Sequence, residues 1–308
     1  MNTMERFAIA GGSALLPSGF QDDVVITVDH GVIVEIGSEA NGAPLMDARG
    51  LRVMPGIIDL HGDGFERHMV PRPSAPFPIE SGLASFDREA AAHGVTTAYL
   101  AQGWSWEGGH RGADYAEAVM QALDGYRGQS LTDLRLQIRA ETHQVDDAQR
   151  LIEAVRRHRV GYVVFNDHLA EGLHMARIAP ADFASWARKV GMSADELAAV
   201  MEAAAQRAKD VPRSLCTLAE AFDGMGVLYG SHDDPDGETR EFYSMLGARI
   251  AEFPLTRRAA SAAHAMMSPV IMGAPNVVRG RSQAGNVSAL ALAAEGLAGF
   301  IIPRADVH

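Results

Sequence analysis

The chain has 308 residues, of which 47% are hydrophobic and 21% are charged, and its formal net charge is −12. This length can bury a large core and suits one barrel-sized domain with a small appendage. The negative charge argues against binding to nucleic acid or to an anionic membrane surface, although local charge can still favour a phosphorylated small molecule. No apolar run approaches the ~20 residues that would span a bilayer.

The N-terminal segment contains Glu5 and lacks the basic-then-apolar layout of a secretory leader. The single cysteine, Cys216, excludes an internal disulfide framework. Both features favour the cytoplasm, because disulfides accumulate in oxidising compartments. The sequence leaves the oligomeric state open, a homo-oligomer included.

Residues 5–53 consist of short apolar stretches separated by turn residues, which is typical of strands. The stretches VVITV and VIVEIG flank Asp29, His30 and Gly31, a sequence that favours a tight turn between paired strands. We therefore expect a small β-domain over residues 1–53.

From residue 54 onward, short apolar stretches alternate with helical patterns, the last of them over residues 284–297. This alternation predicts a parallel sheet, and eight such stretches predict an α/β fold of the (β/α)₈ TIM-barrel type over residues 54–308. Because the chain ends soon after the eighth stretch, we expect an incomplete C-terminus without a final helix. The eight candidate strands are Ile57–His61, Val95–Ala101, Leu134–Glu141, Gly161–Asn166, Met225–Ser231, Arg249–Phe253, Pro269–Gly273 and Gly299–Ile302.

Polar side chains follow several of these candidate strands, and the active sites of such barrels lie at the carboxyl ends of the strands. In an extended segment His61 and Asp63 would point to the same side and could share one ion. Imidazole and carboxylate ligands suit Zn²⁺, our first expectation, and also Mn²⁺ or Fe²⁺. We expect one or two divalent ions, with ligands drawn from His61, Asp63, Glu141, His168 and His232.

Several motifs resemble the amidohydrolase superfamily and, within it, the family of α-D-ribose 1-methylphosphonate 5-triphosphate diphosphatases of the carbon–phosphorus lyase pathway. The first is the stretch from Met54 to Arg67, MPGIIDLHGDGFER. The others, in family order, are Ala140-Glu141, Asp167-His168, SHDD at 231–234 and GAPNVVRG at 273–280. Together they run over most of the chain, which makes the match specific.

The resemblance implies a metal site with one or two ions, held by the five ligands named above. Many relatives bridge two metals with a carboxylated lysine. Here Lys189 and Lys209 both fall in helical stretches, so Glu141 is the expected bridging group. The implied reaction, part of phosphonate catabolism, hydrolyses a phosphonate-ribose triphosphate, releasing pyrophosphate and leaving the 5-phosphate.

The eighth strand departs from the family pattern, in which a Ser-Asp-Tyr segment supplies a metal ligand and general base. By spacing, Arg304 falls where that Asp is expected, and Asp306 lies two positions later. Asp306 and Asp233 are therefore the candidate catalytic carboxylates. This departure also favours an alternative, a catalytically weak paralogue that binds ligand without turnover.

Phosphate oxygens match guanidinium groups well, so arginines near the strand ends are candidate substrate ligands, with ordinary surface arginine as the competing interpretation. The candidate substrate-binding residues are Arg67, Arg72, Asn276, Arg279 and Arg281. A second alternative keeps the metal site but assigns a cyclic amide or N-acyl substrate. The arginines favour the phosphorylated substrate over that alternative.

Overall fold

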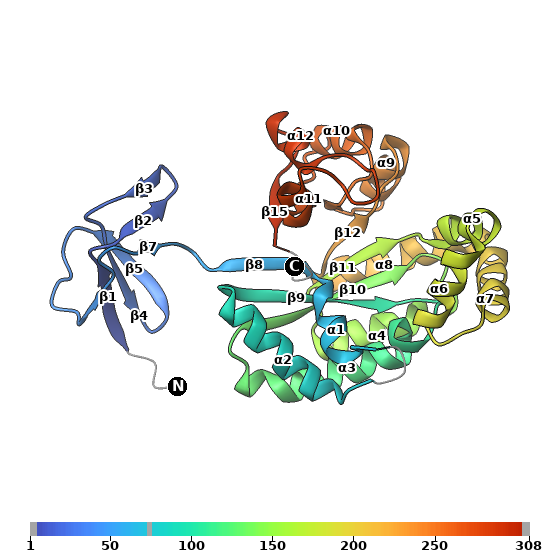
Figure 1. Cartoon of the computed structure of the whole chain (residues 1–308), viewed down its shortest axis with the longest axis horizontal. Helices are drawn as coiled ribbons and strands as arrows, with labels where there is room; N and C mark the ends of the chain where they lie inside the picture. The colour runs from blue at the N-terminus through green and yellow to red at the C-terminus, as the bar shows by residue number, and fades with distance from the viewer. Residues whose placement is uncertain (1–4, 73–75, 304–308) are drawn as a thin grey trace. The chain divides into compact units, whose positions relative to one another are not determined.

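The computed structural model describes residues 5–72 and 76–303 of the chain. It divides into two compact units, of which the first ends at Gly56 and the second begins at Ile57. The first unit contains two small sheets, and the second contains one large parallel sheet with its helices (Figure 1).

The N-terminal unit has a four-stranded sheet in the order β5-β4-β1-β6 and a three-stranded sheet in the order β3-β2-β7. Strands β4 and β5 pair antiparallel across His30 and Gly31, whose φ angles are 47° and 80°. Two successive left-handed residues are the geometry of a type I′ hairpin, so the predicted tight turn is confirmed. The strands are β1 (Arg6–Ala10), β2 (Ser13–Leu16), β3 (Gly19–Gln21), β4 (Val25–Asp29), β5 (Val32–Gly37), β6 (Leu45–Asp47) and β7 (Arg52–Val53).

The second unit is built on eight parallel strands that follow one another in chain order across the sheet. Cα atoms of the first and last strands approach within 8 Å, which bends the sheet into a nearly closed barrel. Within the described residues, no backbone ladder joins these two strands. The expected (β/α)₈ fold is confirmed. Its strands are β8 (Ile57–Gly62), β9 (Val95–Trp104), β10 (Asp133–Glu141), β11 (Tyr162–Asn166), β12 (Leu228–His232), β13 (Ile250–Glu252), β14 (Val270–Gly273) and β15 (Phe300–Ile302).

Helices connect the successive strands, and local signals set their ends. In α7, Ser193 Oγ accepts a hydrogen bond from the Glu196 N–H while the Glu196 carboxylate accepts one from the Ser193 N–H, which is a capping box. The α-helices are α1 (Glu66–Met69), α2 (Ile79–Ala92), α3 (Ala113–Tyr126), α4 (Ala148–His158), α5 (Leu169–Ile178), α6 (Pro180–Lys189), α7 (Ala194–Gln206), α8 (Val211–Met225), α9 (Gly237–Met245), α10 (Arg257–Ala265), α11 (Ala274–Arg279) and α12 (Ala289–Ala294). Short 3₁₀ turns are η1 (Asp63–Phe65), η2 (Gly109–Arg111), η3 (Arg127–Gln129), η4 (Val145–Asp147) and η5 (Ala208–Asp210).

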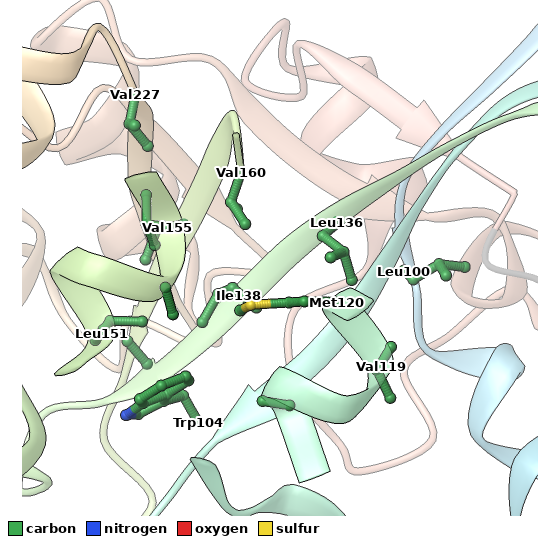
Figure 2. Packing of buried hydrophobic residues seen from close by; sticks show 14 of the residues in the cluster. Leu100, Trp104, Val119, Met120, Leu136, Ile138, Leu151, Val155, Val160 and Val227 are labelled. Atoms are coloured by element: carbon green, nitrogen blue, oxygen red, sulfur yellow. The ribbon is translucent and has the colours of Figure 1, made fainter. Parts of the chain in front are cut away.

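The largest hydrophobic core packs strands β9 and β10 against helices α3 and α4 (Figure 2). Trp104 from β9 and Ile138 from β10 meet Met120 from α3 and Leu151 from α4 in this layer, and all four are at most 2% exposed. Burying side chains of this size contributes about 1.5–3 kcal/mol each. The carboxyl ends of these strands are therefore held on a rigid support.

Helices α5, α6 and α7 form an insertion after β11 with a small core of its own, which includes Phe183, Leu197 and Met201. Trp106, from the loop after β9, packs into the same core. Trp186 Nε1 also donates a hydrogen bond of 2.6 Å to Glu107 Oε2 on that loop. The insertion is thereby attached to the loop that follows β9. No helix in the described part of the chain is long and apolar enough to cross a membrane.

Two elements differ from the sequence-based expectation. Met225 does not begin a strand but ends α8, because Gly226 adopts a left-handed conformation (φ 68°) that stops the helix. The helical pattern over 284–297 yields only the six-residue helix α12. It begins at Ala289 because the Ser288 side chain accepts a hydrogen bond from the Ala291 N–H and caps it.

Candidate metal centre at the strand ends

A fully buried histidine–carboxylate pair joins the first and sixth strands of the barrel. His61 near the end of β8 and Glu252 at the end of β13 approach to 2.8 Å between Nδ1 and Oε2, and both side chains have no exposed area. Gln137 Nε2 and the Tyr162 hydroxyl each donate a 2.6 Å hydrogen bond to Glu252 Oε1. Burial alone would raise the pKa of Glu252, but His61 and these donors hold it below its usual value. Glu252 is therefore an ionised acceptor that fixes the orientation of the His61 ring.

His232, the last residue of β12, lies beside His61. The ring centroids are 4.8 Å apart, and His232 is 8% exposed. The Nε2 atoms of both histidines are buried and have no hydrogen-bond partner among the described residues. Burial is the largest influence on the pKa of His232 and lowers it to about 4. His232 is therefore neutral at pH 7, which is the form that binds a metal ion.

Glu141 at the end of β10 and His168 after β11 form a second pair. The His168 Nδ1 and Glu141 Oε1 atoms are 2.5 Å apart. The backbone N–H of His168 also donates a hydrogen bond of 3.2 Å to Glu141 Oε2. Burial opposes charge on His168, but Asp233 and Glu141 outweigh it and raise its pKa to about 10. Burial would likewise raise the pKa of Glu141, and His168 instead lowers it. Without a bound ion the two side chains hold each other in their charged forms, and binding of a metal ion to His168 would release its proton.

Asp233 links the two pairs. Its Oδ2 atom lies 3.0 Å from His232 Nδ1 and 3.7 Å from His168 Nε2. The backbone turns sharply here, since Asp233 has a φ of 58° and its N–H donates to the Glu252 carbonyl at 2.9 Å. Burial would raise the pKa of Asp233, but the two histidines hold it well below its usual value.

These residues make a donor set that fits a divalent metal ion. There are two groups of potential ligand atoms, and within each group all the atoms lie within 4.8 Å of one another. One group is His61, His232 and Glu252, and the other is His168, His232 and Asp233. Buried imidazole nitrogens without protein partners are costly unless something binds them. The unpartnered Nε2 atoms of His61 and His232 therefore favour an ion, and the mixture of imidazole and carboxylate suits Zn²⁺, Mn²⁺ or Fe²⁺.

Asp63 does not follow His61 in an extended segment, as the sequence suggested. The strand ends at Gly62, and Asp63 starts the 3₁₀ turn η1, so the two-residue strand spacing does not apply. Within the described residues, neither group of potential ligands includes Asp63. Asp306 lies outside the described residues. Lys189 ends α6 and Lys209 lies in η5, so neither lysine is on a barrel strand.

A cavity of about 240 Å³ adjoins the centre through Asp233 and is lined by Asn276 and Arg279. Asn276 also has a structural role: its amide donates to the Val287 carbonyl and accepts from the Ala289 N–H, which holds the loop after α11. The other candidate substrate-binding residues lie elsewhere. Arg67 pairs with Glu89 of α2, while Arg72 and Arg281 are exposed.

The chain is similar to known proteins both in sequence and in fold. The chain is 29% identical over 283 residues to the α-D-ribose 1-methylphosphonate 5-triphosphate diphosphatase of Escherichia coli strain K12, covering 88% of this chain and 73% of the relative. It is also similar to a solved D-hydantoinase (TM-score 0.59, 14% identity, 97% of this chain and 68% of the other). The barrel is of the amidohydrolase type.

A second solved structure has the same amidohydrolase-type fold. It is the N-acetylglucosamine-6-phosphate deacetylase of Pasteurella multocida, with a TM-score of 0.56, 10% identity, and coverage of 96% of this chain and 71% of the other. No protein-family model matches the chain. The resemblance of the sequence motifs to this superfamily is thus confirmed by an independent sequence match and by the fold.

Two residues of the amidohydrolase-type barrel were missed by sequence reasoning. Glu252 ends the sixth strand, and the signal for it was a carboxylate inside the otherwise apolar candidate strand Arg249–Phe253. Arg139 lies two residues before Glu141 on β10. Its signal was a charged residue near the end of a buried strand, the same signal that marked Glu141.

Proposed function

We propose that the chain is a metal-dependent hydrolase of a phosphorylated small molecule, with His61, His232, Glu141, His168 and Asp233 as the residues that hold one or two divalent ions. The observation that carries this proposal is the pair of buried, unpartnered Nε2 atoms of His61 and His232 at the carboxyl ends of barrel strands. A divalent ion there would make a nucleophilic water available near neutral pH and offset negative charge on the substrate. The proposal also includes Asp63 as a further ligand and Glu141 as the group that bridges two metal ions.

The proposed substrate is a phosphonate-ribose triphosphate, with release of pyrophosphate, because the relative with 29% identity carries that activity in its name. The cavity beside Asp233 supports a polar substrate, since Asn276 and Arg279 line it and a guanidinium pairs well with phosphate oxygens. A cytoplasmic role in phosphonate metabolism belongs to the same proposal.

Asp233 is the proposed catalytic carboxylate, since it faces both the histidines and this cavity. Its low pKa keeps it ionised at neutral pH, so it can accept a hydrogen bond from water and orient it. Asp306 stays a second candidate from the sequence. Asp233→Asn and Asp306→Asn, compared at equal metal content, separate the two, because only loss of the catalytic carboxylate then lowers turnover while leaving the Michaelis constant nearly unchanged.

The test combines elemental analysis with an assay for pyrophosphate release from α-D-ribose 1-methylphosphonate 5-triphosphate. We expect one or two transition-metal ions per chain after metal-supplemented expression, and their loss in His232→Ala. Hydantoin and N-acetylglucosamine 6-phosphate serve as competing substrates. Protein without metal, or turnover of the competing substrates alone, would contradict the proposal.

A further inference from the structure

Arg139 is a cation beside the candidate metal centre that has no partner among the described residues. It is partly buried on β10, and in a strand the residue two positions before Glu141 points to the same side as Glu141. Its Nε atom is buried and has no hydrogen-bond partner in the part of the chain that the structure describes. No ion pair joins Arg139 to any residue in the described ranges. A buried charge is costly unless it is paired, so Arg139 calls for an anionic partner.

Arg139 opens onto a cavity of about 20 Å³, which has room for one water-sized group. Asn166 lines the same cavity, is 2% exposed, and has a buried Oδ1 atom without a partner among the described residues. His168 and Glu141 form another part of the wall. The cavity therefore presents an unpaired cation and an unpaired acceptor next to the metal-binding side chains.

Two of the carboxylates around this cavity, Glu107 and Glu141, already have partners. Glu107 accepts hydrogen bonds from Arg111 at 3.2 Å and from Trp186 at 2.6 Å. Glu141 is paired with His168. Glu66 also lines the cavity, and its charge acts on Arg111. Arg139 is thus the cation left to receive a ligand.

The positive charge of Arg139 acts on two side chains of the candidate metal centre, His232 and Glu141. Burial has the largest effect on the pKa of His232 and lowers it, and Arg139 lowers it further. For Glu141, burial raises the pKa while His168 and Arg139 lower it.

We propose that Arg139, together with Asn166, forms an oxyanion subsite that receives one phosphoryl or phosphonyl oxygen of the substrate. The guanidinium donates to that oxygen, and Asn166 Oδ1 accepts from a hydroxyl or a water beside it. This subsite lies on the Glu141 side of the centre, whereas the larger cavity with Arg279 adjoins Asp233. The inference rests on the proposed function, because it assigns a subsite to the same phosphorylated substrate.

The test measures binding of inorganic phosphate to the metal-loaded protein by calorimetry, together with metal content, in wild type, Arg139→Gln and Arg139→Lys. Loss of a charge-assisted hydrogen bond should weaken binding about tenfold or more in Arg139→Gln. Arg139→Lys should recover part of the affinity, because it restores the charge without the planar fork. The control is Arg213→Gln, which removes an exposed arginine of α8 and should leave phosphate binding unchanged.

Unchanged phosphate affinity in Arg139→Gln with full metal content would overturn the subsite and leave an ordered water as the occupant of the cavity. Loss of metal from Arg139→Gln would also overturn it, by giving Arg139 a structural role. Absence of triphosphate hydrolysis in the wild type would count against the proposed function alone. The calorimetric result does not depend on turnover.

Discussion

Glu252 and His61 are 191 residues apart in the sequence, yet Oε2 of one lies 2.8 Å from Nδ1 of the other in a site with no exposed side-chain area. A carboxylate that accepts from one nitrogen of a histidine leaves the other nitrogen free to bind a metal ion, and it fixes the orientation of the ring. The unpartnered Nε2 atom of His61 is in this situation. The pair therefore has a positioning role in the candidate metal centre.

The first prediction concerns Glu252→Gln, which keeps the shape of the side chain but removes its charge. We expect metal affinity to fall about 10- to 100-fold, because the His61 ring loses the partner that orients it. Competition with a coloured chelator would measure the affinity. Glu238→Gln is the matched control, since Glu238 pairs with Arg258 at an exposed position. Equal affinity in Glu252→Gln and wild type would remove Glu252 from the centre.

The second prediction concerns the group that bridges the metal ions. Glu141→Ala should lose metal and activity together, because Glu141 is a buried carboxylate at the end of β10. Lys189→Ala and Lys209→Ala should retain both, since neither lysine lies on a barrel strand. Reconstitution of the metal-free protein should not respond to bicarbonate. A bicarbonate requirement would instead indicate a carboxylated lysine and contradict the assignment.

The third prediction separates stability from metal binding. Asp87 on α2 is fully buried and accepts hydrogen bonds from the Tyr126 hydroxyl and from the backbone N–H groups of Leu131 and Thr132, just before β10. Asp87→Asn weakens or breaks several of these bonds and should lower the free energy of unfolding by about 2 kcal/mol or more.

Urea unfolding would measure this loss. Metal content should stay unchanged, because Asp87 binds the segment just before β10, at the end of the strand opposite the candidate metal centre. Asp133→Asn is the control. Its ion pair with Arg135 is about half exposed on each side, and such a pair is worth about 0–1 kcal/mol. Similar losses in the two variants would show that the Asp87 contacts do not stabilise the fold.

The fourth prediction concerns alkaline pH. Burial, followed by the hydrogen bond to Asp223, raises the pKa of Tyr229 to about 12. Because the folded-state pKa lies above the unfolded value of about 10, folding favours the neutral phenol. This contribution is complete below about pH 10 and is lost as the pH rises through about 12.

Tyr229→Phe should therefore show a smaller decrease in the free energy of unfolding than wild type between about pH 10 and pH 12. Urea titrations at several pH values would measure the difference. The hydroxyl also donates to the Leu246 carbonyl at 2.9 Å, so the variant should be less stable at neutral pH as well. Parallel pH profiles of the two proteins would contradict this account of Tyr229.

The barrel and most of its strands could be predicted from the sequence because they depend on local patterns. Short apolar stretches bounded by turn residues predicted strands, and their alternation with helical patterns predicted a parallel sheet. The errors arose where one residue changed the backbone. The left-handed Gly226 ended a helix where Met225 was predicted to begin a strand, and Ser288 delayed the start of α12.

The sequence alone also predicted a group of metal ligands, since polar residues at the ends of parallel strands meet at one end of a barrel. The group was His61, Asp63, Glu141, His168 and His232, and the structure places Asp63 in a 3₁₀ turn instead of an extended strand. Which atoms face one another was decided only by the tertiary structure. The pairing of His61 with Glu252 and the lack of a protein partner for Arg139 depend on strand register and side-chain packing between distant segments. Local sequence patterns record the type of each residue but not the distances between strands, and those distances determine which side chains form pairs and which remain available to bind a ligand.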